Sequence, residues 1–276
     1  MWRCEDAGFR TASRLFPIIL GLPHTGTELP ADIWERLNSN GKTLADTDWH
    51  IHDLYAGLLD DATTVRATFH RYVIDANRDP AGVSLYPGQN TTGLVPITDF
   101  DGHSIWNDGE EPTEADIAQR LREFHAPYHA ALSAEIERVK AIHGIAILYD
   151  CHSIRSHIPF LFDGALPDFN IGTDMGRTCD PAIESIVCDG AAAAQGYTSV
   201  LNGRFKGGWT TRHYGKPETG VHAIQMELAQ SNHLTTQTPP FAYDREKATR
   251  LRAHLKTILT RLEDFALQAN DKGRSS

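Results

Sequence analysis

Short runs rich in apolar residues recur along the chain and alternate with segments in which apolar residues return every three or four positions. Such runs are typical of buried strands, and we predict strands over 15–20, 64–69 with a continuation to 74, 145–149, 197–201 and 223–228. The other spacing predicts amphipathic helices over 117–139 and 248–265, with shorter helices over 48–59 and 181–194. Strands that alternate with helices predict an α/β fold with a mixed, largely parallel central sheet flanked by helices.

The chain of 276 residues is long enough for one large core, and 41% of its residues are hydrophobic. No linker rich in Pro, Ser or Gly and no block of charge divides it. We therefore expect a single domain over 1–276. Residues 1–14 lack periodicity and 271–276 are polar, so both ends are expected to be loose.

The formal net charge of −10 argues against a nucleic-acid partner, because phosphate binding requires clustered Lys and Arg. A small anionic substrate would need a locally basic pocket. Neither a leader-like segment nor a run of 18 apolar residues occurs, so we expect a cytoplasmic protein that does not enter a membrane. Cys4, Cys151, Cys179 and Cys188 form no C-x-x-C pair, which suits free thiols. The oligomeric state is not indicated.

Polar clusters follow several predicted strands, and α/β sheets bind ligands at the carboxyl ends of their strands. His24 follows the first strand in a Pro/Gly loop, and Asp150 and His152 follow the most apolar strand. Neutral imidazole is a common metal ligand, and a nearby carboxylate can orient it. The alternatives are a loop histidine bonded to backbone and, at Asp150 and Ser153, caps of the next segment. A Cys151–His152 protease pair is disfavoured, because adjacent residues of an extended chain face opposite sides.

Two other acidic features are candidates for chemistry. Segment 46–53 holds three acids and two histidines ahead of a helical stripe, which metal binding and helix N-capping explain equally well. Glu227 interrupts an apolar run, and a buried carboxylate is costly unless it is paired or used, which favours a catalytic base. The alternative is ordinary strand alternation, with Gln225 and Glu227 both facing solvent.

Arginines lie in two of these polar segments. Asn77 and Arg78 follow a predicted strand, while Arg204, Arg212 and His213 lie in or beside a glycine-rich segment. Arginine binds carboxylates through two parallel hydrogen bonds. In a chain this acidic, the pattern indicates an anion pocket or a mobile lid, and the alternative is surface solvation.

Taken in order, seven segments resemble those of the N-formylglutamate amidohydrolases: 22–26, 45–50, 71–78, 85–89, 150–156, 201–208 and 225–230. The resemblance covers nearly the whole chain. That family resembles zinc carboxypeptidases and aspartoacylases, so the resemblance implies a zinc-carboxypeptidase-like (phosphorylase/hydrolase-like) fold.

The resemblance also implies one divalent metal, Zn²⁺, held by two histidines and one acid, which we place at His24, Asp48 and His152. In carboxypeptidases a ligand glutamate lies three residues after the first histidine, whereas position 27 here is a threonine. Asp48 is therefore preferred, with Glu28 and Asp46 as alternatives.

The remaining implied roles concern proton transfer and substrate binding. Glu227 would carry the proton, Arg71 or Arg155 would assist the oxyanion, and the substrate would contact Asn77, Arg78, Arg204, Arg212 and His213. The implied reaction is metal-dependent hydrolysis of N-formyl-L-glutamate to formate and L-glutamate, a step of histidine degradation. The alternatives are a deacylase for another N-acyl amino acid on the same scaffold, or a non-catalytic protein that binds a dicarboxylate or metal. The retained Glu227 argues against the second, because binding alone needs no base.

Overall fold

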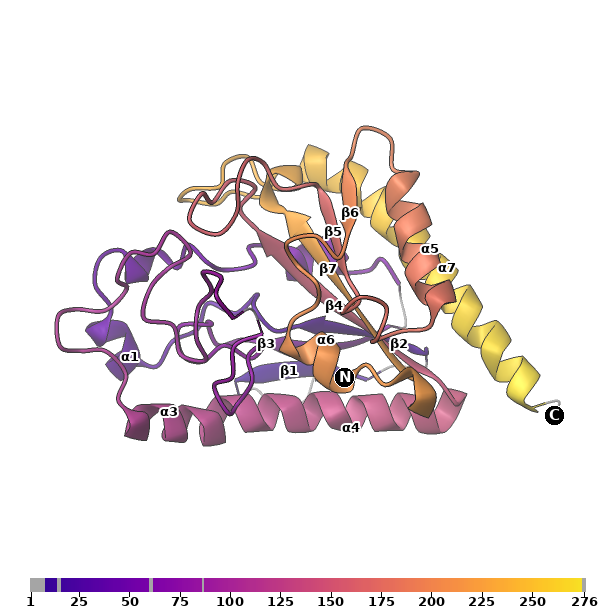
Figure 1. Ribbon diagram of the computed structural model, residues 1–276, viewed down its shortest axis with the longest axis horizontal. Coiled ribbons are helices and arrows are strands. Elements are labelled where there is room, and N and C mark those ends of the chain that lie inside the picture. Colours follow the sequence, from indigo (N-terminus) through magenta and orange to yellow (C-terminus); the bar gives the residue numbers. More distant parts are fainter. Residues whose placement is uncertain (1–7, 14–15, 60–61, 86, 275–276) are drawn as a thin grey trace.

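The computed structural model describes residues 8–13, 16–59, 62–85 and 87–274. Its strands form one sheet in the order β1-β3-β2-β4-β7-β5-β6 (Figure 1). The strands are β1 (Phe9–Ala12), β2 (Ile18–Leu22), β3 (Thr63–Ala67), β4 (Ala146–Ile154), β5 (Phe169–Gly172), β6 (Ser199–Leu201) and β7 (Val221–Ala229). The pairs β1–β3 and β5–β7 are antiparallel and the other four pairs are parallel. The predicted mixed, largely parallel sheet is confirmed.

Helices cover both faces of this sheet. Helix α4 (Ala126–His143) runs along one face, and α5 (Pro181–Ala192) and α7 (Arg245–Arg274) pack together against the other (Figure 1). The side chains of β4 alternate accordingly: Leu148 belongs to the core cluster of α4, and Ile147 to that of α5 and α7. Shorter elements are α1 (Ala31–Arg36), α2 (Ile51–Tyr55), α6 (Trp209–Tyr214) and the 3₁₀ turns Gly41–Thr43, Pro217–Thr219 and Gln230–Asn232. Among the helices described, none has the length and apolar character of a membrane span.

The helix predicted over 117–139 is longer and has an irregular middle. It begins as α3 (Glu114–Arg120), passes through the π-helical segment Leu121–His125 and continues as α4. Thr113 and Asp116 form a reciprocal capping box at its start, which satisfies backbone N–H groups that have no helical partner. Gly144, in the left-handed conformation at φ 71°, ends it.

Two predicted elements are shorter than expected. Strand β3 stops at Ala67, and the predicted continuation to 74 is a turn closed by a bond from Val73 N–H to the His70 carbonyl oxygen. The apolar residues of this turn are buried in the core, so their hydrophobicity reflects burial and does not indicate a strand. The helix predicted over 48–59 is reduced to α2, because His50 before it and Gly57 after it both have positive φ.

Strands β1 and β5 were not predicted. Phe9–Ala12 belongs to the segment expected to be loose but forms an edge strand beside β3. Both strands have only four residues, too few to show a hydrophobic period. At the other end, α7 continues to Arg274. Cys4, Leu15, Tyr86 and the expected loose residues 1–7 and 275–276 lie outside the described residues; Cys151, Cys179 and Cys188 are free thiols.

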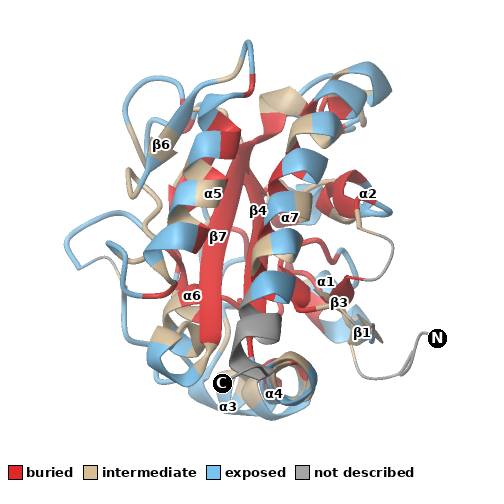
Figure 2. Ribbon diagram, turned by 90° about the vertical axis from the view of Figure 1, so that its right-hand side faces the viewer, coloured by how far each residue is buried: buried red, intermediate tan, exposed pale blue. Residues whose placement is uncertain are grey.

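On the face that α4 covers, the core gives way to polar side chains toward the carboxyl ends of the two central strands. Along β4 the apolar side chains are followed by Asp150 and His152, and along β7 they are followed by Gln225 and Glu227. The register pairs Asp150 with Gln225 and His152 with Glu227. Both strands are buried over their whole length (Figure 2). The sheet therefore presents four polar side chains in a block within the molecule.

Candidate functional site

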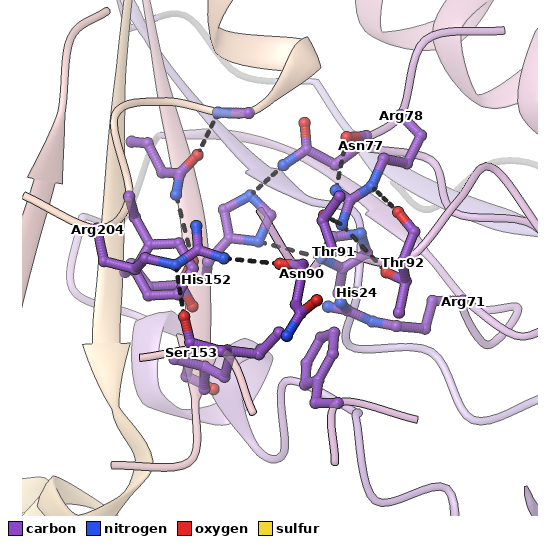
Figure 3. A pocket seen from close by; sticks show the side chains of 17 residues that line it. His24, Arg71, Asn77, Arg78, Asn90, Thr91, Thr92, His152, Ser153 and Arg204 are labelled. Carbon is purple, nitrogen blue, oxygen red and sulfur yellow. Dashed lines mark hydrogen bonds between the residues drawn. The ribbon is translucent and has the colours of Figure 1, made fainter. Parts of the chain in front are cut away.

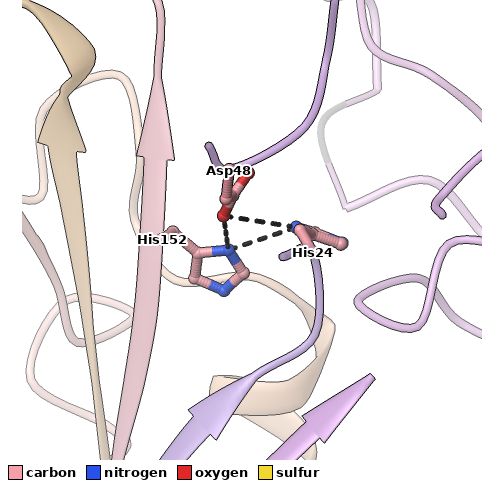
Figure 4. A group of neighbouring side chains, drawn as sticks. All are labelled: His24, Asp48 and His152. Atoms are coloured by element: carbon pink, nitrogen blue, oxygen red, sulfur yellow. Dashed lines mark hydrogen bonds and ion pairs between the residues drawn. The ribbon is translucent and has the colours of Figure 1, made fainter. Parts of the chain in front are cut away.

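His24, Asp48 and His152 come together from three separate parts of the chain (Figure 4). The Nδ1 atoms of the two histidines are 3.2 Å apart, and Asp48 Oδ2 lies 3.1 Å from His152 Nδ1 and 3.8 Å from His24 Nδ1. All three side chains are buried. The Ser153 backbone N–H donates to Asp48 Oδ2 and the Asp48 N–H donates to the His24 carbonyl oxygen, which holds the acid in place. The three predicted ligands therefore lie within reach of one ion.

A carboxylate stands behind each histidine. Asp75 Oδ1 is 2.6 Å from His24 Nε2, and Asp150 Oδ1 is 3.1 Å from His152 Nε2. By donating its Nε2–H to Asp75, His24 presents an unprotonated Nδ1, as a metal ligand requires. His152 Nε2 has Asn77 Nδ2 as its hydrogen-bond partner at 3.2 Å, with Asp150 beside it. Two ligands of a tetrahedral zinc ion at about 2.0–2.1 Å are about 3.3 Å apart, close to the observed Nδ1 spacing. The donor set and its spacing thus fit a divalent metal.

The electric field at this cluster favours a cation. Although burial alone would lower the pKa of His152, Asp150 and Asp48 raise it well above its usual value. Burial, with Arg71 nearby, instead lowers the pKa of His24 to about 4, so this imidazole is neutral. His24 is neutral, and the carboxylates of Asp48 and Asp150 lie on either side of His152. This arrangement suits a metal ion bound to both imidazoles better than protonation of both imidazoles.

The two alternative acid ligands lie elsewhere. Asp46 Oδ2 accepts hydrogen bonds from the Tyr72 hydroxyl and the Phe100 N–H, and burial raises the pKa of its carboxyl to about 7. Glu28 is exposed, and its backbone forms an isolated β-bridge with Phe69, two residues after the end of β3. Neither acid belongs to the group formed with His24 and His152.

Glu227 lies beside His152 across the β4–β7 pair and is only 7% exposed. Burial, together with the negative charges of Asp48 and Asp150, raises the pKa of its carboxyl to about 8, although His152 and Arg71 oppose the rise. A carboxyl group with a pKa near neutrality can both accept and return a proton. The alternative that Gln225 and Glu227 face solvent is wrong, since both side chains are buried.

A pocket opens directly onto this cluster (Figure 3). Of the predicted site residues, it is lined by His24, Arg71, Asn77, Arg78, His152, Arg204 and Glu227. Arg78 and Arg204 hold the segment 90–92 from two sides: Arg78 Nε donates to the Thr92 carbonyl oxygen, and Arg204 Nη2 to that of Asn90 (Figure 3). The pocket therefore combines both histidines of the ligand cluster, the Glu227 carboxyl group and three arginines.

The predicted arginines and His213 separate into two groups. Arg71 is buried, lines the pocket and donates to Asp48 Oδ1 at 2.8 Å. Arg155, Arg212 and His213 do not line it. Arg155 donates to Asp101 Oδ2, Arg212 donates to the Gly207 carbonyl oxygen, and His213 stacks on Trp209. Arg155 was predicted to assist the oxyanion and Arg212 and His213 to contact the substrate, but in this structure local partners hold all three outside the pocket lining.

Several pocket residues were not among the site residues predicted from the sequence. Besides Gln225, they are Asn90, Thr91, Thr92, Phe100, Ser153, Ile154, Leu161, Phe205 and Gly208. Most lie on loops with no period to mark them, and Asp75, which orients His24, was seen only as part of a motif. The one available signal was Gln225, a polar residue two positions from Glu227 in a buried strand.

Residues 16–234 match the profile of the N-formylglutamate amidohydrolase family. This stretch contains every residue of the ligand cluster and the pocket. The chain belongs to this family. It is 46% identical to N-formylglutamate deformylase of Pseudomonas aeruginosa over 89% of this chain and 92% of that one. Identity to the N-formylglutamate deformylase of Pseudomonas putida is 44%, with the same coverage.

A solved member of the N-formylglutamate amidohydrolases has the same fold. The crystal structure of the enzyme from Ralstonia eutropha JMP134 superposes with a TM-score of 0.78 at 25% identity, covering 95% of this chain and 99% of that one. Together with the sequence relatives, this match makes the protein an enzyme of the amidohydrolase class.

Proposed function

We propose that this amidohydrolase cleaves N-formyl-L-glutamate to formate and L-glutamate, with one Zn²⁺ held by His24, Asp48 and His152. The observation that carries the proposal is that two of the three ligands, His24 and His152, line one pocket together with Glu227 and three arginines. The names of the Pseudomonas relatives support the substrate. In this proposal the enzyme acts in histidine degradation.

The chemistry requires a stronger nucleophile than neutral water and stabilisation of the oxyanion. When bound, Zn²⁺ supplies both by lowering the pKa of water to about 7 and by polarising the formyl carbonyl. Glu227 takes the proton from the attacking water and returns it to the departing amine, and its pKa of about 8 suits both steps. Asp75 holds the His24 imidazole in the tautomer the site needs, and Asp150 places a negative charge beside His152.

The arginines have distinct roles in this proposal. Arg71, buried between Asp48 and the pocket, stabilises the negative charge that develops on the formyl oxygen. Arg78 and Arg204 bind the substrate carboxylates, and Asn77 holds the adjacent start of α6 through a bond from Thr210 N–H to its Oδ1. Arg155, Arg212 and His213 have no direct part.

The test is an assay of formate release from N-formyl-L-glutamate by chelator-treated protein, before and after addition of one equivalent of Zn²⁺. We expect activity only after metal is restored. N-acetyl-L-glutamate and N-formyl-L-alanine, run in parallel, separate this activity from that of a deacylase with another acyl or amino-acid preference. Folded, zinc-loaded protein that releases no formate would refute the proposal.

A further inference from the structure

Gln225 uses both ends of its buried amide within the site. It is 3% exposed and lies on the same face of β7 as Glu227, two positions earlier in the strand. Its Oε1 accepts a hydrogen bond of 2.6 Å from the Gly208 N–H, and its Nε2 donates to Glu227 Oε2 at 3.2 Å. The amide therefore connects the turn before α6 to the carboxyl group proposed to move the proton.

The orientation of this amide is determined by its partners. A backbone N–H can only donate, so the end of the side chain facing Gly208 must be the oxygen. The nitrogen then faces Glu227 and donates to it. Reversing the amide would oppose two donors at Gly208 and two acceptors at an ionised Glu227. The bond also limits the directions in which the Glu227 carboxylate can turn.

The turn at 207–208, which donates the hydrogen bond to Gln225, packs closely against the sheet. Gly172, opposite Gln225 on β5, has no room for a Cβ, which would lie 2.4 Å from the Gly207 nitrogen. A Cβ on Gly208 would lie 2.3 Å from Asn77 Nδ2. These close approaches hold the backbone of 207–208 over Gln225, and the preceding residues Arg204 and Phe205 line the pocket.

We infer that Gln225 is a positioning residue, which aims the Glu227 carboxylate and keeps it in register with the turn that carries Arg204. The inference rests on the proposed role of Glu227. An amide present only for stability would satisfy the Gly208 N–H and need no bond to the reacting group. Since its two bonds serve different tasks, losing the bond to Glu227 lowers kcat, whereas losing the bond to Gly208 raises KM.

Two substitutions separate these tasks. Gln225→Glu keeps an acceptor for the Gly208 N–H but replaces the amide donor by a second carboxyl, which shares a proton with Glu227. We expect kcat to fall about 10-fold or more with KM nearly unchanged. Gln225→Met loses both bonds, and we expect the same fall in kcat together with a higher KM. If one variant fails to fold, the other still tests the role of the donor. Wild-type kcat in a folded variant overturns the inference.

A double-mutant cycle with Glu227→Asp tests whether Gln225 acts through Glu227. The shorter side chain withdraws its carboxylate from Gln225 Nε2, so adding Gln225→Met should then lower kcat by no more than about 2-fold. Additive losses mean a structural amide and refute the inference. Gln237, whose amide bridges Ser156 outside the pocket, provides the control: Gln237→Met should leave kcat and KM unchanged.

Wild-type turnover is measured first, which separates the two proposals. Formate release from N-formyl-L-glutamate tests the proposed function alone. If the wild type instead hydrolyses another N-acyl amino acid, the cycle is run with that substrate and its result decides on Gln225. If the zinc-loaded wild type hydrolyses none, Glu227 moves no proton and the role of Gln225 is refuted with it.

Discussion

At the scale of single residues, the site depends on buried charges that hold one another in defined states. Burial alone would raise the pKa of the Asp75 carboxyl, but Arg78, His24 and Arg71 hold it well below its usual value. Asp75 is therefore ionised and keeps the Nε2 proton of His24 on the side away from the cluster. Glu227, with fewer compensating cations, has a raised pKa. The same buried region thus keeps the Asp75 carboxyl ionised and raises the pKa of the Glu227 carboxyl to about 8.

Replacing Glu227 by Gln should abolish that exchange. The amide is nearly isosteric but cannot take a proton from water, so we expect kcat to fall by at least about 10²-fold. The metal content, measured by atomic emission, should stay at one equivalent. Glu135, a shielded glutamate paired with Arg138 outside the pocket, is the control, and Glu135→Gln should not alter turnover. Near-normal turnover of folded, metal-loaded Glu227→Gln would exclude the residue from the mechanism.

Arg78 should select acidic substrates. Its guanidinium lines the pocket, is 21% exposed and lies 3.7 Å from Asp75, so a substrate without a carboxylate forgoes a second ion pair with it. We expect N-formyl-L-glutamine and N-formyl-L-alanine to lose at least about 10²-fold in kcat/KM. Arg78→Lys keeps the charge but loses the planar fork, and should weaken N-formylglutamate use without loss of metal. The control is Arg122→Lys at an exposed position, which should leave kcat/KM unchanged. Equal rates for acidic and neutral substrates would contradict the selectivity proposed for the pocket.

At the scale of elements, α6 should be sensitive to a single methyl group. A Cβ at Gly208 collides with Asn77, so Gly208→Ala must move the start of α6 and disturb the bonds from Gly208 N–H and Thr210 N–H. We expect kcat/KM to fall about 10-fold or more, as small misplacements in a site do. Gly190→Ala is the control: its Cβ would meet Ile258 of α7 at 2.5 Å, far from the pocket. Gly190→Ala should lower the denaturation midpoint and leave turnover per folded molecule unchanged. Unchanged activity of Gly208→Ala would contradict a role for the start of α6 in the site.

The sequence predicted elements well where burial and period coincide. Strands β2, β4 and β7, and helices α5 and α7, have long apolar runs or stripes and were located. Strands β1 and β5 obtain their pairing from neighbours distant in sequence, which no local pattern records. The turn at 69–74 is apolar because it is buried, and only its tertiary surroundings distinguish it from a strand.

The same limit applied to the site. His24, His152 and Glu227 were singled out because a polar residue beside an apolar run is conspicuous, and the resemblance then added Asp48 from the acidic segment 46–53. The direction in which an arginine points depends on which acceptor lies nearest. Arg155 is held by Asp101 and so turns from the pocket, although its position near the end of β4 resembled that of a site residue.

At the scale of the whole molecule, metal binding should stabilise the fold. Asp48, Asp75, Asp150 and Glu227 crowd one interior region, and a divalent ion offsets their repulsion. At free Zn²⁺ of 100 times its Kd, the free energy of unfolding should rise by about 2.7 kcal/mol. Thermal unfolding at graded zinc concentrations measures this, with His24→Ala as a control that should show little shift. A metal-independent midpoint in the wild type would contradict the site.

The position of β7 governs when the enzyme can exist during its own synthesis. This strand, which begins only at Val221, lies in the interior of the sheet between β4 and β5. Until it emerges from the ribosome, β4 has an open edge and β5 with β6 has no central strand to join. β4 ends at Ile154 and β7 at Ala229, so 229 − 154 = 75 residues separate the completion of the two strands. At about 5–20 residues per second their synthesis takes roughly 4–15 seconds. The nascent chain therefore carries both histidines and Asp48 for several seconds before it receives Glu227, and on the roles proposed above we expect no hydrolysis until the sheet closes.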